Sequence, residues 1–340
     1  MKKTIYYFIT IIALFVLIYY SINIGNYKVS PSKIVRILYS RALNKEMPSD
    51  ITAYEKVIVM DLRLPRIIMV LLVGAGLAVC GAASQGIFRN PLVSPFILGV
   101  SSGASLGAAL AIVFLMDKFP HSIDICAGIG GAVAVTAAFL TARKPDGSVP
   151  RLSLVLAGTI ISSLFGSLTG IMKYIADTET QLPAITFWMM GSFGNITWKT
   201  LDIFTLIIPI NIVLMIIFAW QLNVLSLGDK EASLLGMNIK KWKIIYIYFI
   251  VSTVGVCVAR TGVIGWVGLV IPHIGRAMVG PNHKSLLPMA ALVGAAFMLV
   301  SDNIARSATT GEIPVGIITA IIGTPFFIYY LRKKETSVWN

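Results

Sequence analysis

The chain has 340 residues, of which 56% are hydrophobic and 13% charged, and its mean hydropathy is +0.83. A soluble domain of this size carries about a quarter of its residues charged, so most of this surface faces something other than water. The net charge of +13 does not indicate a nucleic-acid partner, because the basic residues lie in short gaps between apolar runs rather than along one stripe.

Apolar runs long enough to cross about 30 Å of hydrocarbon recur along the chain, and they are rich in Gly and Ala. We therefore predict an all-α integral membrane protein with one transmembrane domain, residues 1–340. Its predicted loops include an extracytoplasmic stretch at 25–62 and a cytoplasmic helical stretch at 222–243. The ten predicted transmembrane helices are 4–24, 66–86, 94–116, 123–142, 153–176, 199–221, 244–259, 262–280, 285–305 and 313–331.

The first span follows Lys2 and Lys3 and is long for a signal peptide, without a small-residue cleavage site, so we expect it to be retained. An even number of spans places both termini on one side of the membrane. The basic residues at both ends indicate that this side is cytoplasmic. Basic residues also cluster between Lys28 and Arg66, on the predicted outer side, where the positive-inside rule disfavours them.

Two stretches predict broken or re-entrant segments. Gly86–Ser101 contains Pro91 and Pro95 beside glycines, and Thr261–Gly280 is also rich in glycine. Such residues leave backbone groups unpaired, which lipid tolerates only where protein or a water-filled cavity covers them. A packing kink explains either break alone. Their occurrence in both halves of the chain favours a transporter with internal repeats.

The residues that would energise transport are missing from the chain. It contains no GxxxxGK[ST] loop, so we expect no ATP hydrolysis by this protein. Asp302 is the main carboxylate within the predicted spans, whereas an ion-coupled carrier usually needs several buried acids. Energy is therefore expected from a partner. The 222–243 stretch, an amphipathic helix ending at Gly236, offers that partner a docking surface; a solvated connector helix is the alternative.

Metal and redox sites are not indicated. Cys80, Cys126 and Cys257 lie far apart inside apolar segments, and the histidines form no ligand pattern. We expect structural thiols, no metal site, no cofactor and no catalytic residue.

Nine motifs, in order along residues 58–333, resemble the FecCD-type permeases. These are the permease subunits of type II ABC importers for ferric siderophores, haem and cobalamin. The motifs are Asp61–Arg66 (DLRLPR), Gln85–Leu92 (QGIFRNPL), Leu98–Gly107 (LGVSSGASLG), Leu156–Gly158 (LAG), Phe187–Phe193 (FWMMGSF), Leu225–Gly236 (LSLGDKEASLLG), Gly265–Arg276 (GWVGLVIPHIGR), Ser301–Arg306 (SDNIAR) and Ile313–Gly323 (IPVGIITAIIG).

The resemblance implies a ten-helix subunit in the bacterial cytoplasmic membrane. Such a subunit pairs with a second permease, either identical or paralogous, and with two ATPase subunits. An extracellular substrate-binding protein delivers the substrate. The path runs between the two permeases and is lined mainly by the fifth span of each. A stand-alone secondary carrier or channel is the alternative class.

Several positions match functional residues of the family. Arg63, Arg66 and Arg306 match arginines that meet acidic residues of the binding protein, which would explain a basic outer face; simple snorkelling to the membrane interface is the alternative. The positions that match the coupling helices in the ATPase cleft are Leu225, Gly228, Ala232 and Gly236.

The inner gate is expected at two turns. Asn90 and Leu92 match positions that narrow the cytoplasmic end of the path, and Pro150–Ser153 matches the other gate loop. Cobalamin permeases carry a small hydroxyl pair in that loop, where this chain has Arg151 and Leu152.

The fifth span carries small and hydroxyl residues on one face, because Thr159, Ser163, Gly166 and Gly170 recur at spacings of three or four. Such a face packs closely against another helix or lines a wide passage. The resemblance favours the passage. The expected substrate is a ferric siderophore, the commonest class of the family, with haem or cobalamin as alternatives.

Overall fold

The computed structural model describes residues 2–25, 27–115, 118, 121–145, 149–309 and 311–333, and these residues contain helices and no strand. The elements in chain order are α1 (Lys2–Asn23), α2 (Pro31–Ala42), α3 (Ala53–Val57), the π-helix η1 (Ile58–Arg63), α4 (Leu64–Phe88), the 3-10 helix η2 (Pro95–Leu98), α5 (Val100–Phe114), α6 (Ser122–Ala142), α7 (Arg151–Ile175), α8 (Gln181–Met190), α9 (Ile207–Ile217), α10 (Ala219–Leu227), α11 (Asp229–Leu234), α12 (Ile239–Thr261), α13 (Val267–Val279), α14 (His283–Ser307) and α15 (Val315–Lys333).

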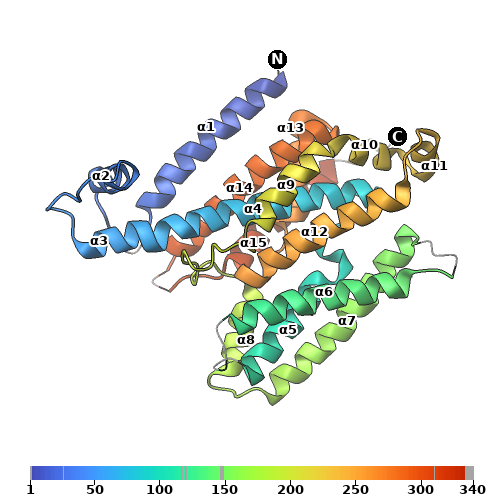
Figure 1. Cartoon of the computed structure of the whole chain (residues 1–340), viewed down its shortest axis with the longest axis horizontal. Coiled ribbons are helices and arrows are strands. Elements are labelled where there is room, and N and C mark those ends of the chain that lie inside the picture. The colour runs from blue at the N-terminus through green and yellow to red at the C-terminus, as the bar shows by residue number, and fades with distance from the viewer. Residues whose placement is uncertain are drawn as a thin grey trace.

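The helix α4 is the centre of the larger group of helices, surrounded by α9, α10, α12, α13 and α14 (Figure 1). Small residues make this packing possible. A Cβ added to Gly74 would collide with the carbonyl oxygen of Gly294, and one added to Gly81 would collide with that of Gly268. In a membrane, such close backbone approach supplies the dispersion contacts that the hydrophobic effect supplies in water.

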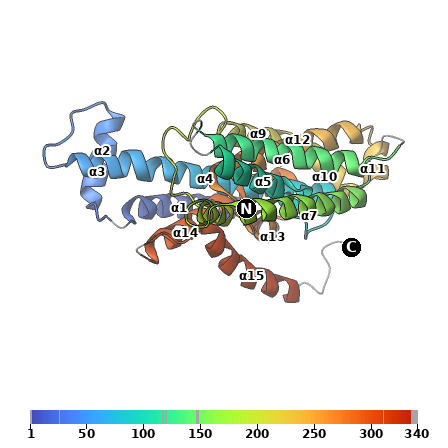
Figure 2. The same ribbon diagram turned by 90° about the horizontal axis from the view of Figure 1, so that it is seen from below.

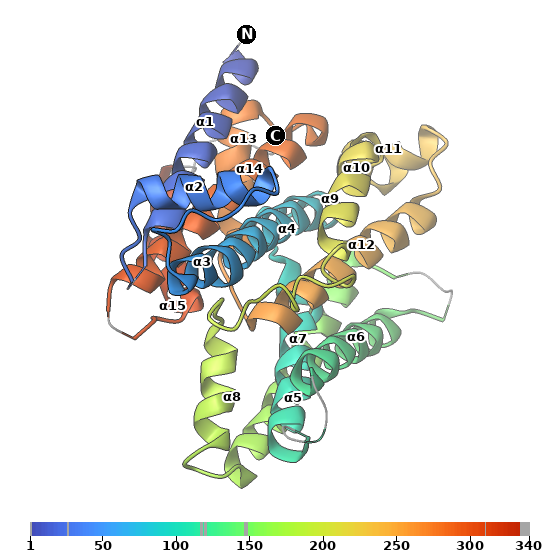
Figure 3. The same cartoon turned by 60° about the vertical axis from the view of Figure 1, so that its left-hand side comes forward.

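A second group comprises α5, α6, α7 and α8, which lie together at one edge of the molecule (Figures 1 and 3). The helices α5 and α6 pack closely because Gly103 faces Gly130 and Gly107 faces the backbone of Cys126. The helix α12 contacts both groups, against α4 on one side and α6 on the other. The α6–α12 contact therefore joins the two groups.

The prediction of an all-helical, multi-pass membrane protein is confirmed. In the described part of the chain, six helices are long and apolar enough to span a membrane, and the pair α9–α10, bent by 62°, makes a seventh candidate. The remaining three predicted spans coincide with α5, α13 and α15, which are shorter apolar helices. The count of ten and the sides of the termini stay predictions.

Two predicted boundaries differ from the structure. The second span begins earlier than residue 66, because a helix runs from Ala53 through α3 and η1 to Phe88. Thr52 and Glu55 form a capping box that starts it. The sixth span begins at Ile207 rather than 199, because Asp202 accepts hydrogen bonds from the next turn, including the Phe204 amide at 3.1 Å.

The predicted break at Gly86–Ser101 is present in the structure. The helix α4 is followed by Arg89, which has a left-handed φ of 51°, and η2 is followed by Gly99, with φ of 83°. The predicted break at Thr261–Gly280 is an irregular stretch between α12 and α13 that contains Gly262, with φ of 69°.

Candidate functional site

The three arginines predicted to dock a binding protein lie at the end of the molecule that carries α2 and α3 (Figure 2). Arg66 donates from Nε and Nη2 to Asp302 Oδ1 at 3.0 and 2.8 Å. It also donates from Nη1 to Glu312 at 2.7 Å. Arg306 lies 3.1 Å from the other oxygen of Asp302 and donates to Ser21 Oγ at 2.8 Å. These contacts join α1, α4 and α14 to the loop before α15.

The side chains of this cluster are buried. Arg63, Arg66 and Arg306 are 5%, 8% and 5% exposed, and Asp302 is fully buried. Arg63 donates to the carbonyl oxygens of Ile22, at 2.6 Å, and Tyr27. In the isolated chain these arginines do not form an exposed basic surface, because internal oxygens already accept their hydrogen bonds. Their docking role stays a prediction.

The exposed basic side chains at this end come from the α2 region, which the sequence reasoning placed in the outer loop without assigning a role. They include Lys28, Arg36, Arg41 and Lys45, and Lys56 of α3 is exposed beside them. Arg36 forms a bidentate ion pair with Asp50, with both nitrogen–oxygen distances at 2.8 Å.

The segment predicted to couple to an ATPase lies at the opposite end, at α10 and α11 (Figure 2). Its two short helices meet at Gly228, whose φ of 143° favours glycine, and α11 is followed by Gly236, with φ of 73°. Leu225 and Ala232 are buried and anchor the segment to the bundle. These two side chains are therefore not a contact surface.

Three leucines of the same segment are exposed instead. Leu234 is 88% exposed, Leu235 57% and Leu227 54%. Exposed large apolar side chains on a polar segment mark a contact site. The sequence reasoning missed them because it matched motif positions and did not separate the two faces of the amphipathic pattern.

The predicted gate residues lie on short turns. Asn90 Oδ1 accepts a hydrogen bond from the Leu92 amide at 2.9 Å, which shapes the turn after α4, and Leu92 is 55% exposed. The helix α7 begins at Arg151, whose side chain lies outside the described part of the structure, and Leu152 is 70% exposed. Gly158 packs on the carbonyl oxygen of Ile97, so α7 rests against the broken segment.

The predicted path residues Thr159, Ser163, Gly166 and Gly170 are all exposed on α7. A Cβ added to either glycine would have no heavy atom within 4 Å. The helix lies at the edge of the molecule, so this face is open in the isolated chain (Figure 1).

A hollow of about 320 Å³ lies between α5 and α7 beside this face. Its polar wall consists of Ser101, Ser102 and Ser105 of α5 with Thr169 and Lys173 of α7. Lys173 forms no ion pair with any residue that the structure describes. An ammonium group and several hydroxyls can together attract and hydrogen-bond an anionic solute.

Within the described residues, no group of His, Cys, Asp and Glu side chains could hold a metal ion. Cys80 and Cys257 are buried free thiols, and Cys126 is half-buried.

The model of the FecCD transport family matches residues 13–333. The molybdate import system permease protein MolB of Haemophilus influenzae is 43% identical over 92% of each chain. The hemin transport system permease protein HmuU of Yersinia pestis is 40% identical over 81% of this chain and 84% of its own. A solved structure described as an inward-facing metal-chelate type ABC transporter is 40% identical, with a TM-score of 0.84 over 96% of this chain and 98% of its own.

Proposed function

Because the chain belongs to the FecCD transport family, a family of non-catalytic ABC importer permeases, we propose that it carries an anionic metal-bearing nutrient across the bacterial cytoplasmic membrane. The observation that carries this proposal is the family match over nearly the whole chain. Ferric siderophore is the substrate we favour, because it is the commonest substrate class of the family and a similar solved structure is described as a metal-chelate type transporter.

The proposed partners follow from three surfaces. The open face of α7 is assigned to a second permease subunit, with the path between the two copies. The exposed leucines of α10 and α11 are assigned to a pair of ATPase subunits, which would supply the ATP hydrolysis that this chain's sequence lacks. The α2–α3 end is assigned to an extracellular binding protein.

The negative charge of the substrate is inferred from the hollow between α5 and α7. Lys173 and the three serines of α5 present donors beside the proposed path. A cationic or neutral solute would gain little there, whereas an anionic chelate would gain a charge-assisted hydrogen bond.

Molybdate is the second candidate substrate. The molybdate permease of Haemophilus influenzae is 43% identical to this chain, and a small oxyanion suits the same donors.

The proposal is tested with the assembled importer in proteoliposomes, loaded with the binding protein encoded beside this chain. Uptake of ferric siderophore, haemin, cobalamin and molybdate is measured with and without ATP. We expect one anionic metal compound to accumulate only with ATP. Ser163→Trp should abolish uptake without preventing assembly, whereas Val133→Trp, on the exposed face of α6 away from the proposed path, should transport normally. Uptake by the chain without an ATPase would support the secondary-carrier alternative.

A further inference from the structure

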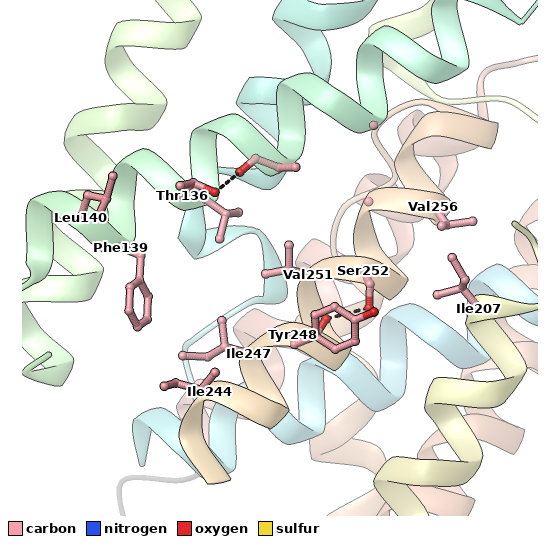
Figure 4. A pocket seen from close by; sticks show the side chains of 14 residues that line it. Thr136, Phe139, Leu140, Ile207, Ile244, Ile247, Tyr248, Val251, Ser252 and Val256 are labelled. Atoms are coloured by element: carbon pink, nitrogen blue, oxygen red, sulfur yellow. Dashed lines mark hydrogen bonds between the residues drawn. The ribbon is translucent and has the colours of Figure 1, made fainter. Parts of the chain in front are cut away.

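An apolar groove runs along the outside of the bundle between α6 and α12 (Figure 4). Its volume is about 550 Å³. Side chains from both helices project toward the space between them, including Phe139 of α6 and Ile247 and Val251 of α12. The neighbouring surface is apolar too, because Ile129 and Val133 of α6 are more than half exposed. The groove therefore opens toward lipid rather than toward the core.

The groove offers almost no polar group to a ligand. Thr136 donates its hydroxyl to the Ala132 carbonyl at 2.8 Å, and Ser252 donates to the Tyr248 carbonyl at 2.6 Å (Figure 4). A water molecule in such a groove lacks the hydrogen-bond partners that would hold it there. At the far end, Gly128 and Gly255 have no heavy atom within 4 Å of an added Cβ, so that end is open. These features suit a hydrocarbon chain.

The length of the groove matches one leaflet of a bilayer. Its lining runs from Gly128 to Leu140 on α6 and from Ile244 to Val256 on α12. Each stretch advances by twelve residues, or about 18 Å at the rise of an α-helix. Half of the hydrocarbon core of a membrane is about 15 Å thick.

A basic mouth opens at the end of the groove nearest α11. The groove shares Phe139, Ile244 and Ile247 with a second hollow of about 790 Å³. The charged residues lining that hollow are Arg143, Lys240, Lys243 and Asp229. Asp229 lies 2.9 Å from Lys243, while Arg143 and Lys240 have no ion pair with any residue in the described ranges. Among the residues that the structure describes, these two cations at the mouth therefore have no acidic partner.

We propose that this site binds an anionic phospholipid from the leaflet on the α11 side of the membrane. One acyl chain lies in the α6–α12 groove, and the headgroup phosphate pairs with Arg143 and Lys240. Basic pockets between membrane helices recognise lipid phosphates in this way. Because the α6–α12 contact joins the two helix groups, the bound lipid bridges them and stabilises the fold. The proposal depends on the chain spanning a membrane and not on its substrate.

The test uses the purified full-length chain in detergent, with dioleoylphosphatidylglycerol, dioleoylphosphatidylcholine or inorganic phosphate added. Native mass spectrometry measures lipid affinity, and thermal unfolding measures stabilisation. We expect phosphatidylglycerol to bind more tightly and to raise the unfolding midpoint more than phosphatidylcholine. Arg143→Ala with Lys240→Ala should weaken phosphatidylglycerol binding by roughly 10- to 30-fold. Phosphatidylcholine binding should weaken clearly less, because the choline ammonium offsets the charge of its phosphate.

The matched control is Lys144→Ala with Lys241→Ala, which removes two exposed charges beside the mouth that do not line it. This control should bind phosphatidylglycerol like the unaltered protein. Gly255→Leu, which fills the open end of the groove, should weaken binding of both lipids, whereas Val133→Leu on the exposed face of α6 should not.

Four results would overturn the proposal. The first is equal affinity for phosphatidylglycerol and phosphatidylcholine, and the second is an equal loss of phosphatidylglycerol affinity in the charge variant and its control. The third is stabilisation by inorganic phosphate equal to that by phosphatidylglycerol. The fourth is unchanged lipid binding by Gly255→Leu. Displacement of phosphatidylglycerol by added ATPase subunits would also overturn it, since the mouth would then be a protein-docking surface.

Discussion

The two ends of the molecule differ in the kind of side chain that they bury or expose. At the α2–α3 end, Arg66, Arg306 and Asp302 are charged yet buried, and each arginine pairs with Asp302. At the α11 end, Leu234 and Leu235 are apolar yet exposed. A buried charge cluster holds the chain's own helices together. Exposed leucines in a polar segment lower the free energy only when another surface covers them. The stronger indication of a partner is therefore at the α11 end.

The largest expected effect comes from removing the acid that Arg66 and Arg306 share. Asp302→Asn keeps the shape of the side chain but removes the acid that pairs with the buried Arg306 and leaves Arg66 with the half-exposed Glu312 alone. We expect a loss of about 3–5 kcal/mol in the free energy of unfolding, measured by denaturant titration in detergent.

Glu312→Gln is the matched comparison, because Glu312 pairs with Arg66 but its side chain is 40% exposed. Its loss should be clearly smaller. An Asp302→Asn protein as stable as the unaltered one would show that the buried cluster does not hold the helices together.

The second prediction concerns the exposed leucines. Leu234→Ser with Leu235→Ser should weaken binding to the ATPase partner by about 10- to 100-fold, because apolar anchors dominate most interfaces. The stability of the isolated chain should not change, since both side chains are exposed. Binding is measured by titrating the purified ATPase onto the permease.

Tyr54→Ser is the control for the leucine variant. Tyr54 is 77% exposed but belongs to α3, which lies at the opposite end of the molecule from α11 (Figure 2). If both variants bind the ATPase alike, the leucines are not its docking surface.

The third prediction compares the exposed and buried faces of α11, in the segment predicted to contact the ATPase. A cysteine at Leu234 should react with a water-soluble maleimide at least about tenfold faster than one at Ala232, because reaction requires access and Ala232 is fully buried. The measurement is labelling kinetics in a Cys126→Ser background, with Cys80 and Cys257 buried. Equal rates would mean that α11 does not hold its described orientation.

The smallest effect is expected from the exposed ion pair of Arg36 and Asp50. The pKa of the Asp50 carboxyl lies below its usual range because Arg36 donates hydrogen bonds to it. Any stabilisation is therefore fully present above the ordinary pKa of the carboxyl and is lost as the pH falls through the lowered pKa of the folded state. Because both side chains are about half exposed, Arg36→Ala should leave the unfolding midpoint unchanged within error at neutral pH. A marked loss would mean that exposed pairs at this end matter as much as the buried cluster.

Much of the fold was predictable from local patterns. The helical spans, the break near Pro91 and Pro95 and the helical nature of 222–243 all follow from hydropathy, proline and glycine, which act on neighbouring residues. The early start of the second span was also readable, from the Thr52–Glu55 capping box. The sixth span was misplaced because 199–206 is apolar enough to resemble a helix although Asp202 organises it as turns.

The sequence by itself determined that this chain is a helical membrane protein of the FecCD family, since periodicity and motifs are properties of neighbouring residues. Only the tertiary structure decided which of its predicted site residues are exposed to a partner and which are buried in internal contacts. Arg66 meets Asp302 and Glu312 at separations of 236 and 246 residues. The α6–α12 groove likewise exists only where these two helices lie against each other. Burial depends on what the fold brings against a side chain, and no local pattern contains that information.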